Sequence, residues 1–404
     1  MTENEKKFYC YGAMWSTAVL FTSGSILQTF FIETGLSSQQ IAEHASMVNI
    51  AQMIAMCIGL NWADRVRNVR GGICLLMLCP ILFAVPMLPF CFEKNPDSLS
   101  IYYVAMICGC ITNLFIGFYN LLANRLPHLI IDMKWYARLA NNSNIMNSIF
   151  SIAVAGAIAL FSVAISYRLI MMFGFILTIV CCISCALLVS QMVITLPPGS
   201  SAKQEGNNKY SVSLTKKVKE KEFRFFLLPT LLRGVAGGGI SIIAVICAAE
   251  ITTNPAVISG LATISTIAMI IGCSLYKAVS LKLKTAKVYL DASVLMLLFM
   301  SAMLLRKTVP FFCICYFGAS IGFGILGTAG AVYAMEIVGY RDIGTYTGFR
   351  YIIISLGQAL STYVIVWAMN YIPTAVIMAI CGVFQLLSGI LYYYYDVSFV
   401  QETG

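Results

Sequence analysis

The sequence predicts an all-α integral membrane protein with about twelve transmembrane helices in two pseudo-symmetric six-helix bundles. Of its 404 residues, 59% are hydrophobic and 11% are charged, whereas charged residues make up about a quarter of an ordinary soluble domain. The apolar residues form charge-poor segments of the length, about 20 residues, that a helix needs to cross a hydrocarbon core. Lys and Arg fall between these segments, so the net charge of +9 does not indicate a nucleic-acid partner.

Twelve such segments follow one another along the chain. They cover residues 8–32, 41–62, 72–92, 99–122, 142–165, 169–194, 225–249, 256–276, 288–305, 310–335, 346–369 and 373–395. We expect the first to be a retained helix, because it is too long for a signal-peptide core and no small-residue cleavage site follows it. The last two separate before Pro373, since proline removes a backbone donor and disfavours a helical residue before it.

A polar interruption divides the twelve segments into two groups of six. We therefore predict an N-terminal bundle at 1–196, a cytoplasmic linker at 197–222 and a C-terminal bundle at 223–404. With both termini inside, 21 of the 26 Lys and Arg residues lie on the cytoplasmic side and four lie outside. This bias follows the positive-inside rule and predicts a multi-pass protein of the cell (inner) membrane with both termini cytoplasmic.

The cysteines and histidines do not indicate a metal centre or an enzyme. Most of the 15 Cys residues lie inside apolar segments, where cysteine behaves as a small hydrophobic residue. Pairs such as Cys108 and Cys110 lack the spacing of structural zinc sites, and the chain has only two His. We therefore expect no cofactor, no metal and no catalytic residues.

The turn between the second and third segments carries a charged motif at residues 59–70. With the two six-helix halves and the linker, this turn resembles that of the major facilitator superfamily of secondary transporters. In that family a Gly, an Asp and spaced basic residues form the turn, and the Asp helps to latch the inner face closed. Asp64 and Arg65 match the pattern, whereas Gly59 stands one place early and Arg67 replaces the second Gly. The resemblance implies alternating access with Asp64 and Arg65 at the inner gate.

Three further arginines are gating candidates. Arg138 and Arg341 each precede small polar residues that open the next segment of their half, as expected of two weakly similar repeats. Arg350 lies about 12 Å into the eleventh segment at 1.5 Å per residue. There it either lines the inner cavity or pairs with Asp64 when the inner side closes.

Polar residues recur at helical spacing inside four of the apolar segments. Such stripes mark either the lining of a cavity or a contact between helices. Our candidates for substrate binding from these stripes are Thr22, Ser25, Gln28, Asn113, Asn120, Asn144 and Gln358.

Arg233 is the most informative single residue. It lies about eleven residues, or roughly 16 Å, from the inner end of its segment, near the middle of the bilayer. A guanidinium keeps its proton and must therefore face water, a carboxylate or a bound anion. The sequence places no acid at a comparable depth, which favours an anionic solute over a buried ion pair. The glycines between Gly234 and Gly239 would let the helix bend or let its backbone approach a ligand.

We interpret the chain as a secondary active transporter of a small polar solute, such as a sugar or an organic acid, for which Arg233 favours an anion. We expect proton-coupled uptake by a monomer in the lipid bilayer. The coupling candidates are Glu43, His44, Glu250 and Asp291, which could instead be gate or interfacial charges. Two alternatives stay open: proton-linked efflux of drugs or amphipathic metabolites, and a non-transporting receptor or scaffold.

Overall fold

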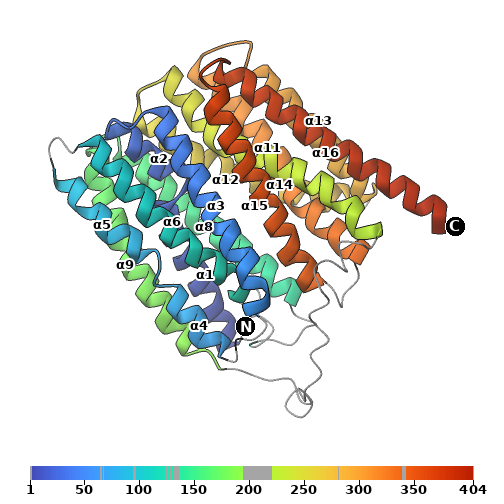
Figure 1. Cartoon of the computed structure of the whole chain (residues 1–404), viewed down its shortest axis with the longest axis horizontal. Helices are drawn as coiled ribbons and strands as arrows, with labels where there is room; N and C mark the ends of the chain where they lie inside the picture. Colours follow the sequence, from blue (N-terminus) through green and yellow to red (C-terminus); the bar gives the residue numbers. More distant parts are fainter. Residues whose placement is uncertain are drawn as a thin grey trace. The chain divides into compact units, whose positions relative to one another are not determined.

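The computed structural model describes residues 2–63, 66, 68–93, 97–123, 126, 130, 136–193, 221–280, 282–338 and 343–403. The regular elements in these ranges are all helices (Figure 1). The chain packs as two compact units. Unit 1 comprises Met1–Ser23, Ala51–Val154 and Ile165–Glu220, and unit 2 comprises Gly24–Ile50, Ala155–Ala164 and Lys221–Gly404. The predicted division at 1–196, 197–222 and 223–404 stays a prediction, and most of its linker lies outside the described residues.

The helices confirm the all-α fold class and the twelve predicted segments. In the first half they are α1 (Glu3–Thr22), α2 (Gly24–Glu33), α3 (Ser38–Ala63), α4 (Val69–Leu76), α5 (Ile81–Phe92), α6 (Ser98–Ala123), α8 (Tyr136–Phe161) and α9 (Tyr167–Ser190). In the second half they are α11 (Lys221–Ile251), α12 (Pro255–Val279), α13 (Thr285–Ala302), α14 (Val309–Val338), α15 (Ile343–Ala368) and α16 (Thr374–Thr403).

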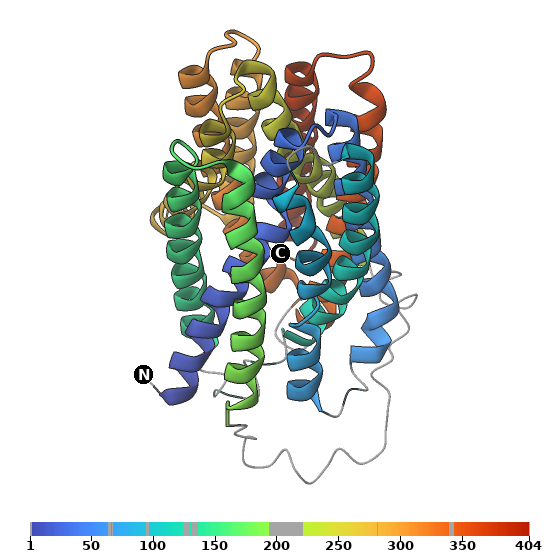
Figure 2. The same ribbon diagram turned by 90° about the vertical axis from the view of Figure 1, so that its left-hand side faces the viewer.

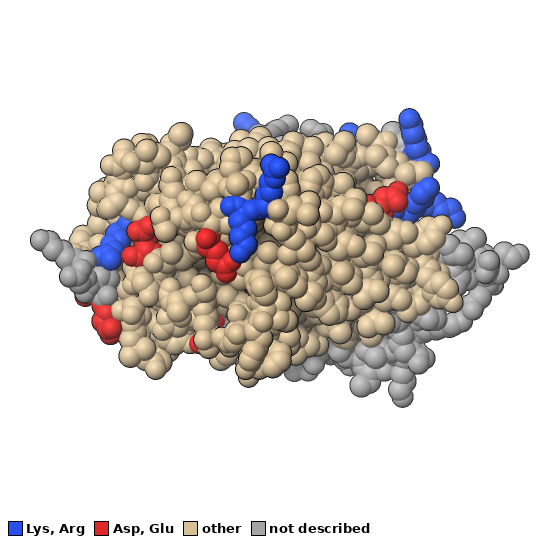
Figure 3. All heavy atoms as spheres, turned by 90° about the horizontal axis from the view of Figure 1, so that it is seen from above, with Lys and Arg blue, Asp and Glu red and all other residues tan. Residues whose placement is uncertain are grey.

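Two of the predicted segments are built from two helices each. The first is interrupted at Ser23, where Gly24 takes a φ of 72° that glycine adopts at little cost. The third divides into α4 and α5 around Pro80, the residue before α5. Ten spans are long and apolar enough to cross a membrane, and shorter apolar stretches in α8 and α15 complete the set. On the face drawn in Figure 3, Lys, Arg, Asp and Glu form a few separate groups on a surface that is mostly uncharged.

In unit 1, α1 packs along α9, and α5 packs against both α6 and α9 (Figure 2). The α1–α9 contact is close because Gly174 leaves room for the ring of Phe21. Nearby, the Thr178 hydroxyl donates a 3.3 Å hydrogen bond to the carbonyl of Ala18. Cys182 and Cys185 are fully buried in this core and pack as small apolar side chains.

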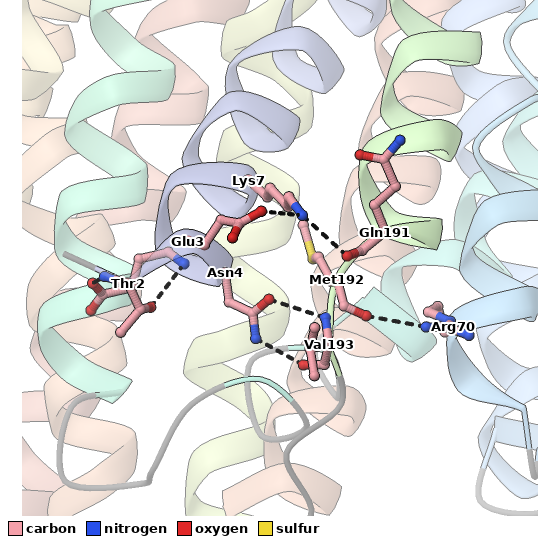
Figure 4. A network of polar contacts seen from close by, with 9 residues as sticks. Thr2, Glu3, Asn4, Lys7, Arg70, Gln191, Met192 and Val193 are labelled. Carbon is pink, nitrogen blue, oxygen red and sulfur yellow. Dashed lines mark hydrogen bonds and ion pairs between the residues drawn. The ribbon is translucent and has the colours of Figure 1, made fainter.

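One end of unit 1 is held by hydrogen bonds to the C-terminal end of α9 (Figure 4). Arg70 donates to the carbonyl of Met192 at 3.1 Å, and Lys7 donates to that of Gln191 at 3.2 Å. The side chain of Asn4 pairs with both backbone groups of Val193. Cations here satisfy carbonyl groups that a helix end leaves unbonded. Arg70, the last residue of the charged turn, therefore has a structural contact of its own.

In unit 2, glycines bring several helices into close backbone contact. A Cβ atom on Gly234 would lie 2.5 Å from the carbonyl oxygen of Ile354, and one on Gly238 would lie 2.7 Å from the Cα of Gln358. Helix α11 is continuous through these glycines, and whether they also let it bend stays a prediction. They serve the packing of α11 against α15.

Unit 2 also includes α2 and the first part of α3. Helix α2 packs against α11 and α12, and Ala42 of α3 contacts Ile242 and Ile246 of α11 in an apolar cluster. The hydroxyl of Ser46 donates a long, 3.4 Å hydrogen bond to the carbonyl of Ala359 in α15. Segments from both halves of the sequence thus meet within this unit through apolar surface and few polar bonds.

The close packing of α12 against α14 leads to a stability prediction. A Cβ on Gly272 would overlap the carbonyl oxygen of Ile321, and overpacking of this kind costs about 1–3 kcal/mol. We expect Gly272→Ala to lower the thermal unfolding midpoint of the detergent-purified protein. In the same helix Gly260 has no atom within 4 Å of its Cβ position, so Gly260→Ala should keep or raise the midpoint. Equal midpoints for the two variants would contradict this account of the packing.

Candidate functional site

The side chains of two arginines meet inside unit 2. Arg233 of α11 and Arg350 of α15 both face Gly330 of α14. A Cβ atom on Gly330 would lie 2.5 Å from Arg233 Nη1 and 2.8 Å from Arg350 Nη2. Together, these distances place the two nitrogens within about 5 Å of each other. We call these two residues the arginine pair.

The arginine pair has unused hydrogen-bonding capacity. Arg233 Nη1 and Arg350 Nε are buried without a hydrogen-bond partner. Among the side chains that the structure describes, no carboxylate contacts either guanidinium group. The side chain of Glu336 is not among them. Two unit charges about 5 Å apart repel by about 3 kcal/mol at an effective dielectric constant of 20. The arrangement is therefore costly unless an anion or water enters between the two arginines.

The local sequence explains how two cations come so close. Gly330 has no side chain, so the guanidinium groups occupy the space that a methyl group would fill. Gly234 and Gly238 let the backbone of α15 approach α11, which brings Arg350 within reach of Arg233. Removal of Cβ atoms is the usual way in which membrane helices pack at short distances.

Two buried tyrosines lie beside the arginine pair. The rings of Tyr289 and Tyr392 pack edge to face with centroids 4.5 Å apart, and Tyr289 Cε2 lies 3.4 Å from the Cβ position of Gly330. The Tyr392 hydroxyl bonds to Thr230 at 3.0 Å, and the Tyr289 hydroxyl bonds to Ser388 at 3.4 Å. Because these hydroxyls have partners, the tyrosines form a rigid wall rather than a source of counter-charge.

A cavity of about 120 Å³ lies among α11, α12, α13 and α14. Its lining is mostly apolar, with three hydroxyl groups. The lining residues are Gly237, Ile240, Ser265, Met269, Met296, Tyr316, Ala319, Ser320 and Phe323. The predicted substrate-binding residue Gln358 is nearby, with its Nε2 atom 3.8 Å from the Cβ position of Gly237.

The remaining stripe residues differ in how their polar groups are used. Thr22 donates to the carbonyls of Ala18 and Val19 in its own helix, and Asn113 donates to Gly109 at 2.9 Å. Such bonds suit helix packing as well as a cavity lining.

On α2, Gln28 is 8% exposed and its Oε1 atom is buried without a partner. Ser25 accepts the Thr29 hydroxyl at its carbonyl, and Asn120 is partly buried. The side chain of Asn144 lies outside the described part. The binding roles of these residues stay predictions.

The four coupling candidates have described surroundings of their own. Glu43 accepts a 3.0 Å hydrogen bond from Gln39, and the buried His44 packs its ring edge to face against Phe31 at 5.1 Å. Glu250 accepts a 2.7 Å bond from the Thr374 hydroxyl.

Asp291 is exposed beside an apolar groove of about 200 Å³ between α12, α13 and α14. Glu250, the other candidate in the second half of the sequence, is also exposed. No contact described here tests a role in coupling for any of the four.

The predicted gate lies largely outside the described residues. This applies to Asp64, Arg65 and Arg341, and to the side chain of Arg138 in α8. The latch therefore stays a prediction. Arg350 is the exception, because the structure places it beside Arg233, a residue that the sequence had suggested for a separate role.

Sequence reasoning missed several residues of the two cores. In unit 1 the hydroxyl groups of Tyr11 and Tyr119 share a short hydrogen bond, and Trp15 packs on Tyr119 with ring centroids 4.2 Å apart. In unit 2 it missed Gly330 and Tyr289. The glycine-rich run around Gly330 was a usable signal, whereas an aromatic residue in an apolar helix resembles ordinary core.

Comparisons with known proteins identify the fold. No family model and no curated protein matches the sequence. Solved structures do match across nearly the whole chain. The inward-open xylose transporter XylE from E. coli is 13% identical with a TM-score of 0.70, covering 96% of this chain and 94% of that one. A POT family transporter in complex with a thioalcohol-conjugated peptide is 12% identical with a TM-score of 0.71, covering 98% and 96%. The E. coli fucose:proton symporter FucP is 15% identical with a TM-score of 0.61, covering 96% and 98%.

The chain therefore shares the fold of these transporter structures, which agrees with the helix pattern predicted from the sequence. The three structures are named as a xylose transporter, a POT family transporter and a fucose:proton symporter. At these identities the likeness establishes the fold alone. What this chain carries must be argued from its own site, in which the arginine pair is the distinguishing feature.

The geometry at Gly330 predicts the effect of a single methyl group. We expect Gly330→Ala to fold, because the atoms that its Cβ meets are the ends of flexible side chains, but to push the guanidinium groups apart. We expect added butyrate to raise the unfolding midpoint of the purified wild-type protein and to raise that of Gly330→Ala severalfold less, since stabilisation by a ligand grows with the ratio of its concentration to its dissociation constant. Gly327→Ala, one turn earlier on α14 and with no atom within 4 Å, is the control and should keep the full rise. An unchanged rise in Gly330→Ala would contradict the assignment of this site.

Proposed function

We propose that this protein is a secondary active transporter that carries a small polar anion across the cell membrane by alternating access. The observation that carries the proposal is the arginine pair, with its buried and unpartnered nitrogens. We assign Arg350 to the binding site together with Arg233, with Gln358 beside the adjoining cavity. The inner gate at Asp64, Arg65, Arg138 and Arg341 is retained as part of the proposal.

An anionic solute suits this site better than a neutral one. Ionised side chains inside a membrane protein face partners or a water-filled path, because burial without compensation is expensive. Among the residues that the structure describes, the surroundings of the arginine pair are phenols and a second cation, and this favours a bound anion. A guanidinium presents several donors in one plane that match the oxygens of a carboxylate or phosphate.

Alternating access has structural support in unit 2. There α2 and the first part of α3, from the first half of the sequence, meet α11, α12 and α15 from the second half. The contacts described there include the apolar side chains of Ala42, Ile242 and Ile246 and the long hydrogen bond from Ser46. A contact of this kind can separate at modest cost, as a gate between two packed elements requires.

Proton-driven uptake is the coupling mode that we propose. Two of the similar structures are named as proton symporters, one for D-xylose and one for fucose. In this chain Glu43, His44, Glu250 and Asp291 are the candidates for carrying the proton. Both termini and the linker at 197–222 would face the cytoplasm, and a single copy of the chain would suffice.

Transport itself is tested in proteoliposomes with an imposed pH gradient. We expect uptake of at least one labelled organic acid, abolished by a protonophore. Arg233→Gln should lower uptake efficiency by about 10- to 100-fold, since a hydrogen bond to a charged group contributes about 1.5–3 kcal/mol.

The matched control is Arg306→Gln, which removes an exposed charge in the connection before α14 and should leave uptake unchanged. Uptake of neutral sugars alone, or full activity of Arg233→Gln, would contradict an anionic solute. Loss of preloaded compound from the liposomes without uptake would favour efflux.

A further inference from the structure

The cavity next to the arginine pair carries information about the rest of the solute. We propose that the solute is an amphiphilic organic acid, with its anionic group at the arginine pair and a compact apolar body of about five heavy atoms in the methionine-lined cavity. This inference rests on the proposed function and names its substrate class.

Helical register places the cavity and the arginine pair on common faces. On α11, Gly237 follows Arg233 by four residues, and on α14 Phe323 precedes Gly330 by seven. Residues four or seven apart lie on one side of a helix. The separation along the helix axes is roughly 6–11 Å at 1.5 Å per residue. One organic acid can span this distance.

The other helices of the site agree with this register. On α13, Met296, which lines the cavity, follows Tyr289, which lies beside the arginine pair, by seven residues. On α15, Gln358 follows Arg350 by eight. Helix α14 has the opposite order because it runs back after the short connection from α13. On each of these four helices, a residue near the arginine pair and a residue near the cavity therefore lie on one side, displaced along the helix axis.

The cavity lining favours an apolar body. Met269, Met296 and Phe323 contribute flexible thioethers and an aromatic ring, side chains that adapt to apolar groups of irregular shape. The hydroxyl of Ser265 donates to Ala262 in its own helix at 3.0 Å and lies next to the Tyr316 hydroxyl. Because these hydroxyls bond within the protein, a sugar would leave many of its own hydroxyls without partners, which is costly.

The size of the cavity limits the body. A cavity of about 150 Å³ holds one benzene molecule, and this one has about 120 Å³. It therefore fits a branched alkyl group or a small ring. A hexose has a ring as large as benzene and carries hydroxyl groups besides, so it exceeds the available space.

A homologous series of carboxylates tests the proposal. Dissociation constants for acetate, propionate, butyrate, pentanoate and hexanoate are measured by calorimetry on the purified full-length protein at constant pH and ionic strength. Each buried methylene group is expected to tighten binding by about fourfold. The gain should end where the body fills the cavity, near hexanoate.

Two variants locate the body. Gly237→Ala adds one methyl group to the cavity, where its Cβ would be 3.7 Å from Phe323 and therefore fits without overlap. It should leave acetate binding unchanged and shorten the best chain by about one carbon. Ala319→Leu fills more of the cavity and should remove most of the gain from acetate to hexanoate. Gly327→Ala, outside the cavity, should reproduce the wild-type series.

The outcomes separate this inference from the proposed function. Equal affinity for acetate and hexanoate, or a series unaffected by Gly237→Ala and Ala319→Leu, would overturn the amphiphilic class and leave an anion transporter. Tighter binding of xylose than of any acid would overturn both. A folded wild-type protein that binds none of the acids would overturn the proposed function and this inference with it.

Discussion

Electrostatic repulsion between Arg233 and Arg350 is the constraint on which the account of this protein depends. Both guanidinium groups approach one glycine, and each keeps a buried nitrogen without a partner. Both side chains are only half-buried, and no carboxylate within the described residues contacts them, so bringing two like charges this close costs free energy. A bound anion would offset this repulsion, and anion binding is the role that we propose for the site.

The surrounding packing is consistent with a site held in advance of its ligand. Glycines on α11 and α14 remove the Cβ atoms that would keep the two arginines apart, and Tyr289 and Tyr392 form a wall with satisfied hydroxyl groups. All of these residues lie on helices, which hold side chains more firmly than loops do. In our proposal, the cavity next to the arginine pair holds the apolar part of the solute. In the function that we propose, charge selects the head group and cavity shape selects the body.

Much of the fold could be predicted from the sequence because membrane helices are signalled by length and the absence of charge. Arg233 could also be singled out, since its depth follows from counting residues. The meeting with Arg350 could not, because depth along a helix does not reveal which face points inward, and the sequence suggested a gate for that residue. Thr22 and Asn113 show the same limit: a polar side chain can bond to its own helix instead of a cavity. The interruption at Ser23 was missed although Ser23, Gly24 and Ser25 form a small polar cluster of the kind that marks turns.

A double-mutant cycle on the arginine pair tests the central claim most directly. Dissociation constants for butyrate are measured for the wild type, Arg233→Gln, Arg350→Gln and the double variant, with folding of each checked by its unfolding midpoint. If both guanidinium groups hold one anion, each single change weakens binding and the two effects are non-additive by about 1 kcal/mol or more. Effects that add within about 0.5 kcal/mol, or single variants that bind as the wild type does, would contradict a shared anion site.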